Sequence, residues 1–243
     1  MSIIKLDAIA STNTFLKEMI STQTVEDFTV VTAKYQSNGK GQMGAKWTSE
    51  PSKNLMFSMF VDTSSFYLEY PFYLSMLAAL AVRQSLNSLS IPQLYIKWPN
   101  DILSQNKKVC GILIENVMKQ GRTNASIIGV GLNVNQNEFN ALPNAASLKH
   151  ITGCTYNLDE LLDSIIFNLK YYISKLKSGH LDALKKEYEL YLFRKDKPST
   201  FKDAKGNMFS GFITSVDETG SLNVLLEDNI TKSFMLKDIT LMY

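Results

Sequence analysis

Lys97-Trp98-Pro99-Asn100-Asp101 ends a short predicted strand over residues 94–97. The Trp98-Pro99 pair restricts the backbone to an extended turn, so Asn100 and Asp101 are expected at a strand terminus. Functional side chains are often held at such a position, where Asp101 could bind a magnesium ion or a hydroxyl group. An Asn-Asp turn with no further role is the competing interpretation.

Lys107-Lys108-Val109-Cys110-Gly111-Ile112-Leu113-Ile114-Glu115 follows, and its apolar run predicts a strand over residues 109–117. A lysine that precedes such a strand can place an ammonium in a largely dry pocket, where it acts strongly on developing negative charge. A solvated hairpin turn is the alternative. Cys110 is a conceivable nucleophile, but no histidine stands near it in sequence to activate it.

Two glycine-rich segments flank these motifs. Residues 36–47 read Gln-Ser-Asn-Gly-Lys-Gly-Gln-Met-Gly-Ala-Lys-Trp, a polar loop whose glycines allow backbone N–H groups to approach an anion such as phosphate. A flexible surface loop explains the same composition. Residues 129–135 read Gly-Val-Gly-Leu-Asn-Val-Asn, and alternate glycines in a strand indicate that a ligand or another backbone packs close.

The remaining pattern mixes helices and strands without regular βαβ alternation, which argues against a doubly wound sheet. Ser11-Thr12-Asn13-Thr14 is a polar cluster with Ser11 as the expected N-cap of a helix. Further helices are predicted at 70–89, 158–176 and 181–192, and further strands at 3–6, 28–35, 55–61 and 126–134. After residue 192, short strands at 209–216, 222–226 and 231–236 between tight turns suggest a small antiparallel barrel.

Composition narrows the function classes. The 243 residues carry 25 Lys plus Arg and 23 Asp plus Glu, and this near-neutral balance argues against a protein that mainly grips DNA or an acidic membrane. Cys110 and Cys154 are too few for a disulfide framework or a four-cysteine zinc site, and we expect two reduced core thiols in a cytoplasmic protein. With His150 and His180 outside every motif, lysine, carboxylate and amide groups must carry the chemistry.

The order and spacing of these motifs resemble biotin protein ligases (biotin–[acetyl-CoA-carboxylase] ligases) over nearly the whole chain. The resemblance implies an α+β fold: a mixed β-sheet flanked by helices, like that of class II aminoacyl-tRNA synthetases, over residues 1–192. A small SH3-like β-barrel is implied for residues 193–243. Because the first predicted strand begins at Ile3, we expect the form that lacks an N-terminal DNA-binding domain, and no DNA binding.

The resemblance also implies an activity. ATP with Mg²⁺ activates biotin as biotinyl-5′-AMP, and a lysine of a biotin carboxyl carrier protein then receives the biotin. A carboxylate is already ionised at neutral pH, so the first step needs no general base. Alternatives are a lipoate or octanoate ligase or transferase of the same fold, and a non-catalytic biotin sensor. The enzyme is expected to be a monomer or a homodimer.

Residue roles are implied only where this sequence matches the family's motifs. Lys108 and Asp101 are the expected catalytic residues, with Asp101 as a nucleotide or Mg²⁺ contact. Biotin is expected to meet Ser11, Thr12, Asn13, Gln36, Gly111 and Gly131. The adenylate is expected to meet Gly39, Lys40, Gly41, Gln42, Trp47 and Asn133.

One segment departs from the family pattern. Where Gly-Arg-Gly-Arg-x-Gly-Arg is common, residues 39–45 read Gly-Lys-Gly-Gln-Met-Gly-Ala. Gln42 supplies no charge, and Lys40 cannot make the bidentate contact of an arginine. We therefore expect weaker retention of biotinyl-AMP, and a loop that is mobile without ligand and ordered with it.

Overall fold

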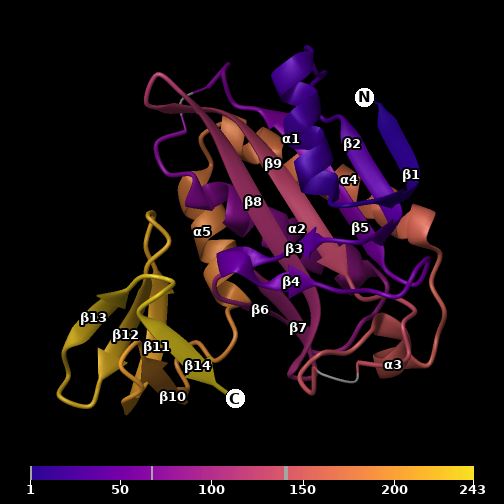
Figure 1. Cartoon of the computed structure of the whole chain (residues 1–243). Coiled ribbons are helices and arrows are strands. Elements are labelled where there is room, and N and C mark those ends of the chain that lie inside the picture. Colours follow the sequence, from indigo (N-terminus) through magenta and orange to yellow (C-terminus); the bar gives the residue numbers. More distant parts are fainter. Residues whose placement is uncertain (1, 67, 140–141) are drawn as a thin grey trace.

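The computed structural model describes residues 2–66, 68–139 and 142–243. Among them a seven-stranded mixed sheet forms the larger layer, in the order β1-β2-β5-β9-β8-β7-β6 (Figure 1). β1 and β2 are parallel, and every other neighbouring pair is antiparallel. The strands are β1 (Ile3–Ile9), β2 (Val30–Gln36), β5 (Leu55–Asp62), β6 (Leu94–Lys97), β7 (Asp101–Ser104), β8 (Lys107–Lys119) and β9 (Arg122–Leu132).

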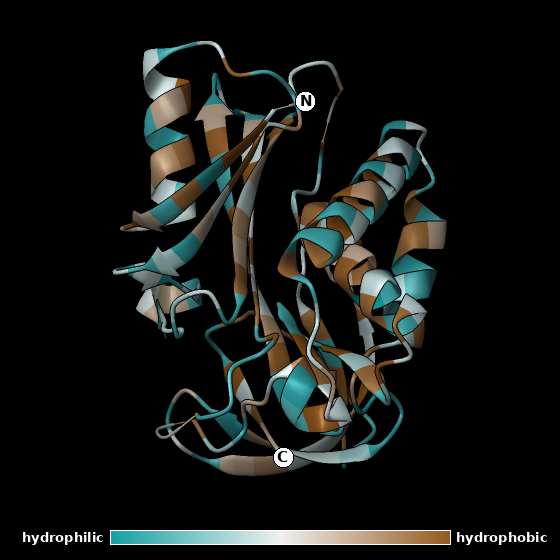
Figure 2. Ribbon diagram, turned by 90° about the vertical axis from the view of Figure 1, so that its right-hand side faces the viewer, coloured by the Kyte–Doolittle hydropathy of each residue, from teal (hydrophilic) through white to brown (hydrophobic). Residues whose placement is uncertain are grey.

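Helices cover both faces of this sheet (Figure 2). α1 (Thr12–Thr22) packs on β2, β5 and β9, and its buried Leu16 joins a small apolar cluster with Ile127. On the other face lie α2 (Phe72–Ser88), α4 (Leu158–Lys177) and α5 (Leu181–Leu190), while α3 (Leu148–Thr152) is a single short turn. The mixed α+β class with a helix-flanked sheet is thereby confirmed.

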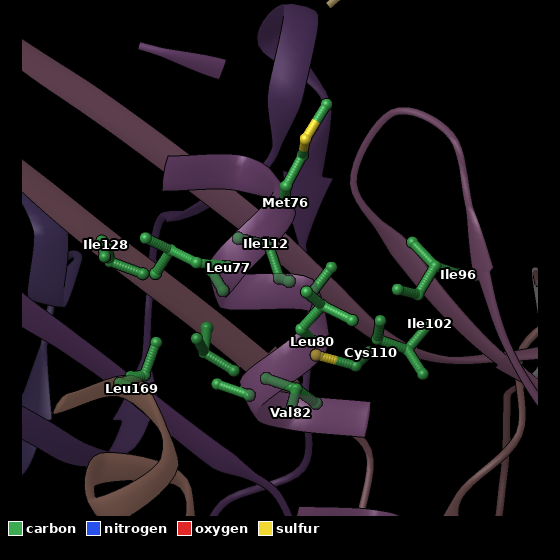
Figure 3. Packing of buried hydrophobic residues seen from close by; sticks show 14 of the residues in the cluster. Met76, Leu77, Leu80, Val82, Ile96, Ile102, Cys110, Ile112, Ile128 and Leu169 are labelled. Carbon is green, nitrogen blue, oxygen red and sulfur yellow. The ribbon is translucent and has the colours of Figure 1, made fainter. Parts of the chain in front are cut away.

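The main core lies between the sheet and α2. Met76, Leu77 and Leu80 of α2 are fully or almost fully buried and face apolar side chains of β8 and β9, among them Ile112 and Ile128 (Figure 3). α2 is apolar on nearly every side because α4 and α5 cover the face that the sheet leaves open. The site therefore rests on a rigid, close-packed floor.

A second, antiparallel sheet follows α5. In the described part of the chain it has five strands in the order β13-β12-β11-β10-β14, and it does not close into a barrel there. Its members are β10 (Pro198–Asp203), β11 (Met208–Val216), β12 (Leu222–Leu226), β13 (Thr231–Phe234) and β14 (Ile239–Met242). The predicted hairpins are correct, and the closed SH3-like barrel is not confirmed.

Several local predictions need correction. The structure adds β7, α3, β10 and β14, which were too short or too polar to show a periodic pattern. Residues 36–46 are not only a loop, because β3 (Gly39–Lys40) and β4 (Lys46–Trp47) pair around a 3₁₀ turn at Gln42–Gly44. Ser11 holds the N-cap position of α1, but its side chain makes no capping hydrogen bond.

The two cysteines also differ from the expectation. Cys110 is a buried core thiol as predicted, whereas Cys154 is exposed, so the prediction of two core thiols is wrong for Cys154. Neither forms a disulfide. Among the helices of the described residues, none is long and apolar enough to cross a membrane.

Candidate active site

A cavity of about 280 Å³ opens on the α1 side of the sheet, close to the lower limit of ordinary ligand pockets (~300–1,000 Å³). It brings together all but two of the residues predicted from sequence. Those that line it are Ser11, Thr12, Asn13, Gln36, Lys40, Gly41, Gln42, Trp47, Asp101, Lys108, Gly111 and Gly131. The sequence motifs therefore converge on one site, although their individual roles are not tested by this placement.

The alternation of β8 and β9 explains the floor of the cavity. Successive side chains of a strand point to opposite faces, and Ile112, Ile128 and Val130 point into the main core. Gly111 and Gly131 therefore point to the α1 side and pair with each other across the two strands. Because they lack side chains, the Trp47 indole and the Lys108 side chain can lie directly against the sheet here, at the bottom of the cavity.

One end of the cavity is lined by uncharged polar groups at the start of α1, which are supported from outside the cavity by Glu115. Gln36 Oε1 accepts from the Thr12 backbone N–H at 2.8 Å and from Thr12 Oγ1 at 3.1 Å. The Ser58 hydroxyl oxygen lies 2.7 Å from Thr12 Oγ1 and 2.5 Å from Asn13 Oδ1. Asn13 Nδ2 donates to Glu115 Oε2 at 2.9 Å. Every side chain of this network is thus held in place by another.

Gly129 makes this network possible. A Cβ atom at position 129 would lie 2.2 Å from Asn13 Oδ1, a distance at which one of the two must move. The backbone of β9 thus approaches the Asn13 amide more closely than any side chain would permit. Gly129 thus makes room for the Asn13 amide, and Gly131 makes room for the Trp47 indole on the cavity floor.

The other end of the cavity is charged, and a β-bulge aims its central side chain. Ile102 pairs with Cys110 and Leu103 pairs with Lys108, so Val109 is one extra residue in β8. Val109 and Cys110 consequently both point into the core, and the next side chain back along β8 turns to the α1 side. Without the extra residue, strand alternation would direct Lys108 to the core face.

Lys108 Nζ lies 2.6 Å from Asp101 Oδ1, and Lys97 Nζ lies 3.7 Å from Asp101 Oδ2. One carboxylate thus lies between two ammonium groups and leaves one excess positive charge. Burial lowers the pKa of Lys97, an effect that Asp101 opposes and Lys108 reinforces. This end is suited to bind anions, because it combines net positive charge with partial exclusion of water.

Trp47 packs against the glycines of the cavity floor. Its indole lies against the cavity floor, where a Cβ atom at Gly131 would come within 2.6 Å of it. The β3–β4 hairpin carries Trp47 and is closed by a 2.7 Å hydrogen bond from the Gly41 N–H to the Ala45 carbonyl. Trp47 Nε1 and Gln42 Oε1 are buried without a hydrogen-bond partner among the described residues.

Two predicted residues lie outside this cavity. Gly39 sits at the base of the hairpin, where a Cβ atom would lie 2.4 Å from the Trp47 carbonyl oxygen, so it serves the close pairing of β3 and β4. Asn133 lines a neighbouring cavity of about 900 Å³ that also reaches Trp47 and Lys108. Asn133 therefore lies next to the first cavity and not inside it, and its contact with a nucleotide stays a prediction.

Sequence reasoning missed three lining or supporting residues. Ser58 is the one polar residue inside the otherwise apolar run 55–61, and this exception could have indicated a hydrogen-bonding role. Lys97 was quoted in a motif without a role, although its i,i+4 spacing from Asp101 fits a pair of residues that face each other across a three-residue turn. Leu236 comes from the turn between β13 and β14, and no local pattern could place it at this cavity.

The residues present do not form a metal centre. Among the described residues no group of three or more His, Cys, Asp or Glu side chains gathers to hold an ion. Asp101 is the only carboxylate among the described residues that line the cavity, and two lysines already contact it. A resident Mg²⁺ does not fit this donor set, because Mg²⁺ held by protein usually has uncompensated carboxylate ligands.

Comparison with known proteins agrees with the motif analysis. The sequence profile of the biotin/lipoate A/B protein ligase family matches residues 6–133. The bifunctional ligase/repressor BirA of Bacillus spizizenii is 37% identical over 134 residues, which are 55% of this chain and 41% of that protein. The biotin–[acetyl-CoA-carboxylase] ligase of Mycobacterium tuberculosis is 32% identical over 150 residues, or 59% of this chain and 54% of that one. The chain thus spans about two fifths to one half of these curated relatives.

Among solved structures, the biotin protein ligase from Aquifex aeolicus in complex with biotin and ATP superimposes with a TM-score of 0.82. The sequence identity is 26%, and the alignment covers 99% of this chain and 98% of that one. The similarity therefore includes the C-terminal sheet as well as the large layer.

Proposed function

The chain belongs to the biotin/lipoate A/B protein ligase family, and from this premise we propose that it activates biotin with ATP and transfers it to a carrier protein. The observation that carries the proposal is a single cavity with an uncharged polar end and a lysine end. The intermediate is biotinyl-5′-AMP. The acceptor is a lysine of a biotin carboxyl carrier protein or domain.

The first step asks the site to hold two anions together. The biotin carboxylate attacks the α-phosphorus of ATP; a C–O–P bond forms, the bond to the β-phosphate oxygen breaks, and pyrophosphate leaves. Lys108 and Lys97 reduce the repulsion between carboxylate and phosphates, and Lys108 stabilises charge that develops on the α-phosphate. Since the carboxylate is already ionised, no residue has to remove a proton.

The uncharged end favours biotin over lipoate. The ureido ring of biotin carries a carbonyl acceptor and two N–H donors, whereas the dithiolane ring of lipoate has no strong hydrogen-bonding group. Thr12, Asn13 and Ser58 are buried hydroxyl and amide groups that require polar partners. These groups already pair with Gln36, Glu115 and one another, and a ureido ring can use their remaining donor and acceptor capacity whereas a dithiolane cannot, so lipoate is the weaker candidate.

In the second step the ε-amine of the carrier lysine attacks the mixed anhydride. A C–N bond forms, the C–O bond to AMP breaks, the amine loses a proton and AMP leaves. The same lysine end binds the departing phosphate. Trp47 and the β3–β4 hairpin shield the anhydride from water before the carrier arrives, which limits its hydrolysis.

Mg²⁺ is proposed only as an ion that enters with the nucleotide phosphates, and no step depends on a protein ligand for it. For residues 193–243 we retain the SH3-like module as a proposal, supported by five antiparallel strands joined by tight turns. The division at residue 192, the cytoplasmic location, the absence of DNA binding and the monomer or homodimer state stay predictions.

The test is acid-dependent exchange of pyrophosphate into ATP, followed by transfer to a carrier domain. We expect exchange with biotin, much less with lipoate, and biotin-labelled carrier as the final product. Absence of exchange with biotin would leave only a sensor role. Faster exchange with lipoate than with biotin would reverse the assignment of the acid.

A further inference from the structure

An aromatic series links the large sheet to the C-terminal sheet and ends at the active-site lysine Lys97. The Tyr95 ring on β6 lies 5.7 Å from that of Phe193, and Phe193 meets Tyr243 edge-on at 5.3 Å. Tyr243, which follows β14, places its ring 4.9 Å from Lys97 Nζ. Figure 1 shows β14 on the side of the C-terminal sheet that faces β6 and β7.

Lys97 needs such support. Among the described residues its one ion pair, with Asp101, spans 3.7 Å, and Lys108 engages the same carboxylate at 2.6 Å. A lysine has four rotatable side-chain bonds, so one long ion pair fixes its ammonium poorly. The face of the Tyr243 ring supplies a second attractive contact, since aromatic faces attract cations at this distance.

The C-terminal sheet holds Tyr243 in a fixed position relative to the site. Trp98, next to Lys97 in sequence, donates from Nε1 to the Gly220 carbonyl oxygen at 2.9 Å. Lys185 of α5 pairs with Glu218 at 2.8 Å. The sheet is thus attached to both the motif at 97–101 and α5, and Tyr243 is not a freely moving terminus of a strand.

The position of Tyr243 also points to the nucleotide. Tyr243 lines the neighbouring cavity of about 900 Å³ together with Trp47, Lys108 and Asn133. Leu236, from the turn that precedes β14, lines the first cavity. Lys97 is therefore held at the boundary between the two cavities, where phosphates that join a bound acid to a bound nucleoside must pass.

We propose that Tyr243 is a positioning residue whose ring holds the Lys97 ammonium toward the phosphates of ATP. This inference rests on the proposed function, because it assigns the nucleotide to the lysine end. Tyr243 itself does no chemistry. It acts through Lys97, so its loss should weaken ATP binding and leave biotin binding, at the uncharged end, unchanged.

The test compares Tyr243→Leu with Tyr243→Phe in the full chain. The Leu variant loses the ring, and we expect the Kd for ATP to rise roughly fivefold, a cation–π-sized effect. The Phe variant keeps the ring and should stay within about twofold of the parent. Tyr171→Leu is the matched control, since Lys175 lies 4.7 Å from that exposed ring, on α4.

A double-mutant cycle with Lys97→Gln separates positioning from general destabilisation. If the ring acts through Lys97, Tyr243→Leu should have no further effect on the Kd for ATP once the ammonium is gone. Additive effects, or equal affinities for the Leu and Phe variants, would overturn the inference. Equilibrium dialysis with ATP keeps this readout separate: lack of exchange in the parent would reject the proposed function, not the role of Tyr243.

Discussion

The two ends of the cavity are built on opposite physical principles. At the uncharged end, Thr12, Asn13 and Ser58 are almost completely buried, and each is fixed by another polar group. At the charged end, the Lys108 side chain is 34% exposed, and its fixed partner is one carboxylate that it shares with Lys97. The side chains of the first end are already fixed by their own hydrogen bonds. The second end carries an excess positive charge, and its Lys108 side chain is less restrained.

The difference indicates a division of labour. Buried polar groups held in fixed positions discriminate strongly, because only a ligand with matching donors and acceptors can use their remaining hydrogen-bonding capacity. An excess ammonium in a partly dry site instead acts on charge that develops during reaction. Specificity for the acid should therefore depend on the α1 end, and rate on the lysine end, and mutations can separate the two.

The largest expected effect is that of Lys108→Ala. Under the proposed function this ammonium faces the α-phosphate, so its removal should lower kcat for pyrophosphate exchange by about 10²–10³-fold, the size found when one preorganised donor is lost. The Kd for biotin should change by less than about threefold, because the uncharged end stays intact. Exchange kinetics and direct biotin titration measure the two quantities.

Lys119→Ala is the matched control for this variant, since Lys119 lies at the far end of the same strand. It should leave both quantities unchanged. An equal loss of biotin affinity and kcat in Lys108→Ala would contradict the division between the two ends.

Ser58→Ala should have the converse effect. It leaves Thr12 Oγ1 and Asn13 Oδ1 without the Ser58 hydroxyl, so the free energy of unfolding should fall by about 1–3 kcal/mol. The Kd for biotin should rise roughly tenfold, equivalent to about 1.4 kcal/mol. The kcat at saturating biotin should hold within about twofold.

Ser126→Ala separates stability from recognition, because Ser126 is equally buried and donates to Asn116 Oδ1 at 2.8 Å, away from the cavity. Denaturant unfolding should show a similar loss in both variants. If Ser126→Ala weakened biotin binding as much as Ser58→Ala, the effect would be one of general stability.

A smaller effect is expected at the β3–β4 hairpin. Gln42 stands where an arginine is common in the family, and its Oε1 is buried without a partner among the described residues. Gln42→Arg should slow release of biotinyl-AMP roughly fivefold, about 1 kcal/mol, through a charge-assisted contact with phosphate. Gln42→Lys should lie between the two, because it adds charge without the planar fork. Equal off-rates for all three proteins would reject the idea.

The order of the motifs made most residues of the site predictable, whereas the bulge in β8 and the contacts between distant segments could be found only in the structure. The glycines were visible because alternate glycines are unusual in a strand, and the polar cluster at 11–14 was visible because Ser, Thr and Asn are typical of a helix start. The bulge at Val109, which turns Lys108 to the site, has no sequence signature, because Val109 and Cys110 read as ordinary strand residues. Ser58 and Leu236 reach the cavity through strand pairing and sheet docking, which no local pattern encodes.

The smallest expected effect on activity is that of replacing Cys110, the thiol nearest to the charged end in sequence. Cys110 lies beside Lys108 in space and sequence, but burial raises the pKa of its thiol well above the usual range, an effect that Lys108 only partly opposes. A thiolate is therefore scarce at neutral pH, and Cys110 cannot serve as a nucleophile. Iodoacetamide should modify one thiol per native chain, the exposed Cys154, and both after unfolding.

Cys110→Ala should consequently leave kcat within about twofold of the parent and lower stability by a cavity-sized amount of roughly 1 kcal/mol. Cys154→Ala, at the exposed thiol, is the control and should change neither. Rapid labelling of Cys110 in the native protein, with parallel loss of exchange, would mean that the core opens at the lysine end. In that case strands of the sheet would move at the charged end, in addition to the β3–β4 hairpin and the lysine side chains.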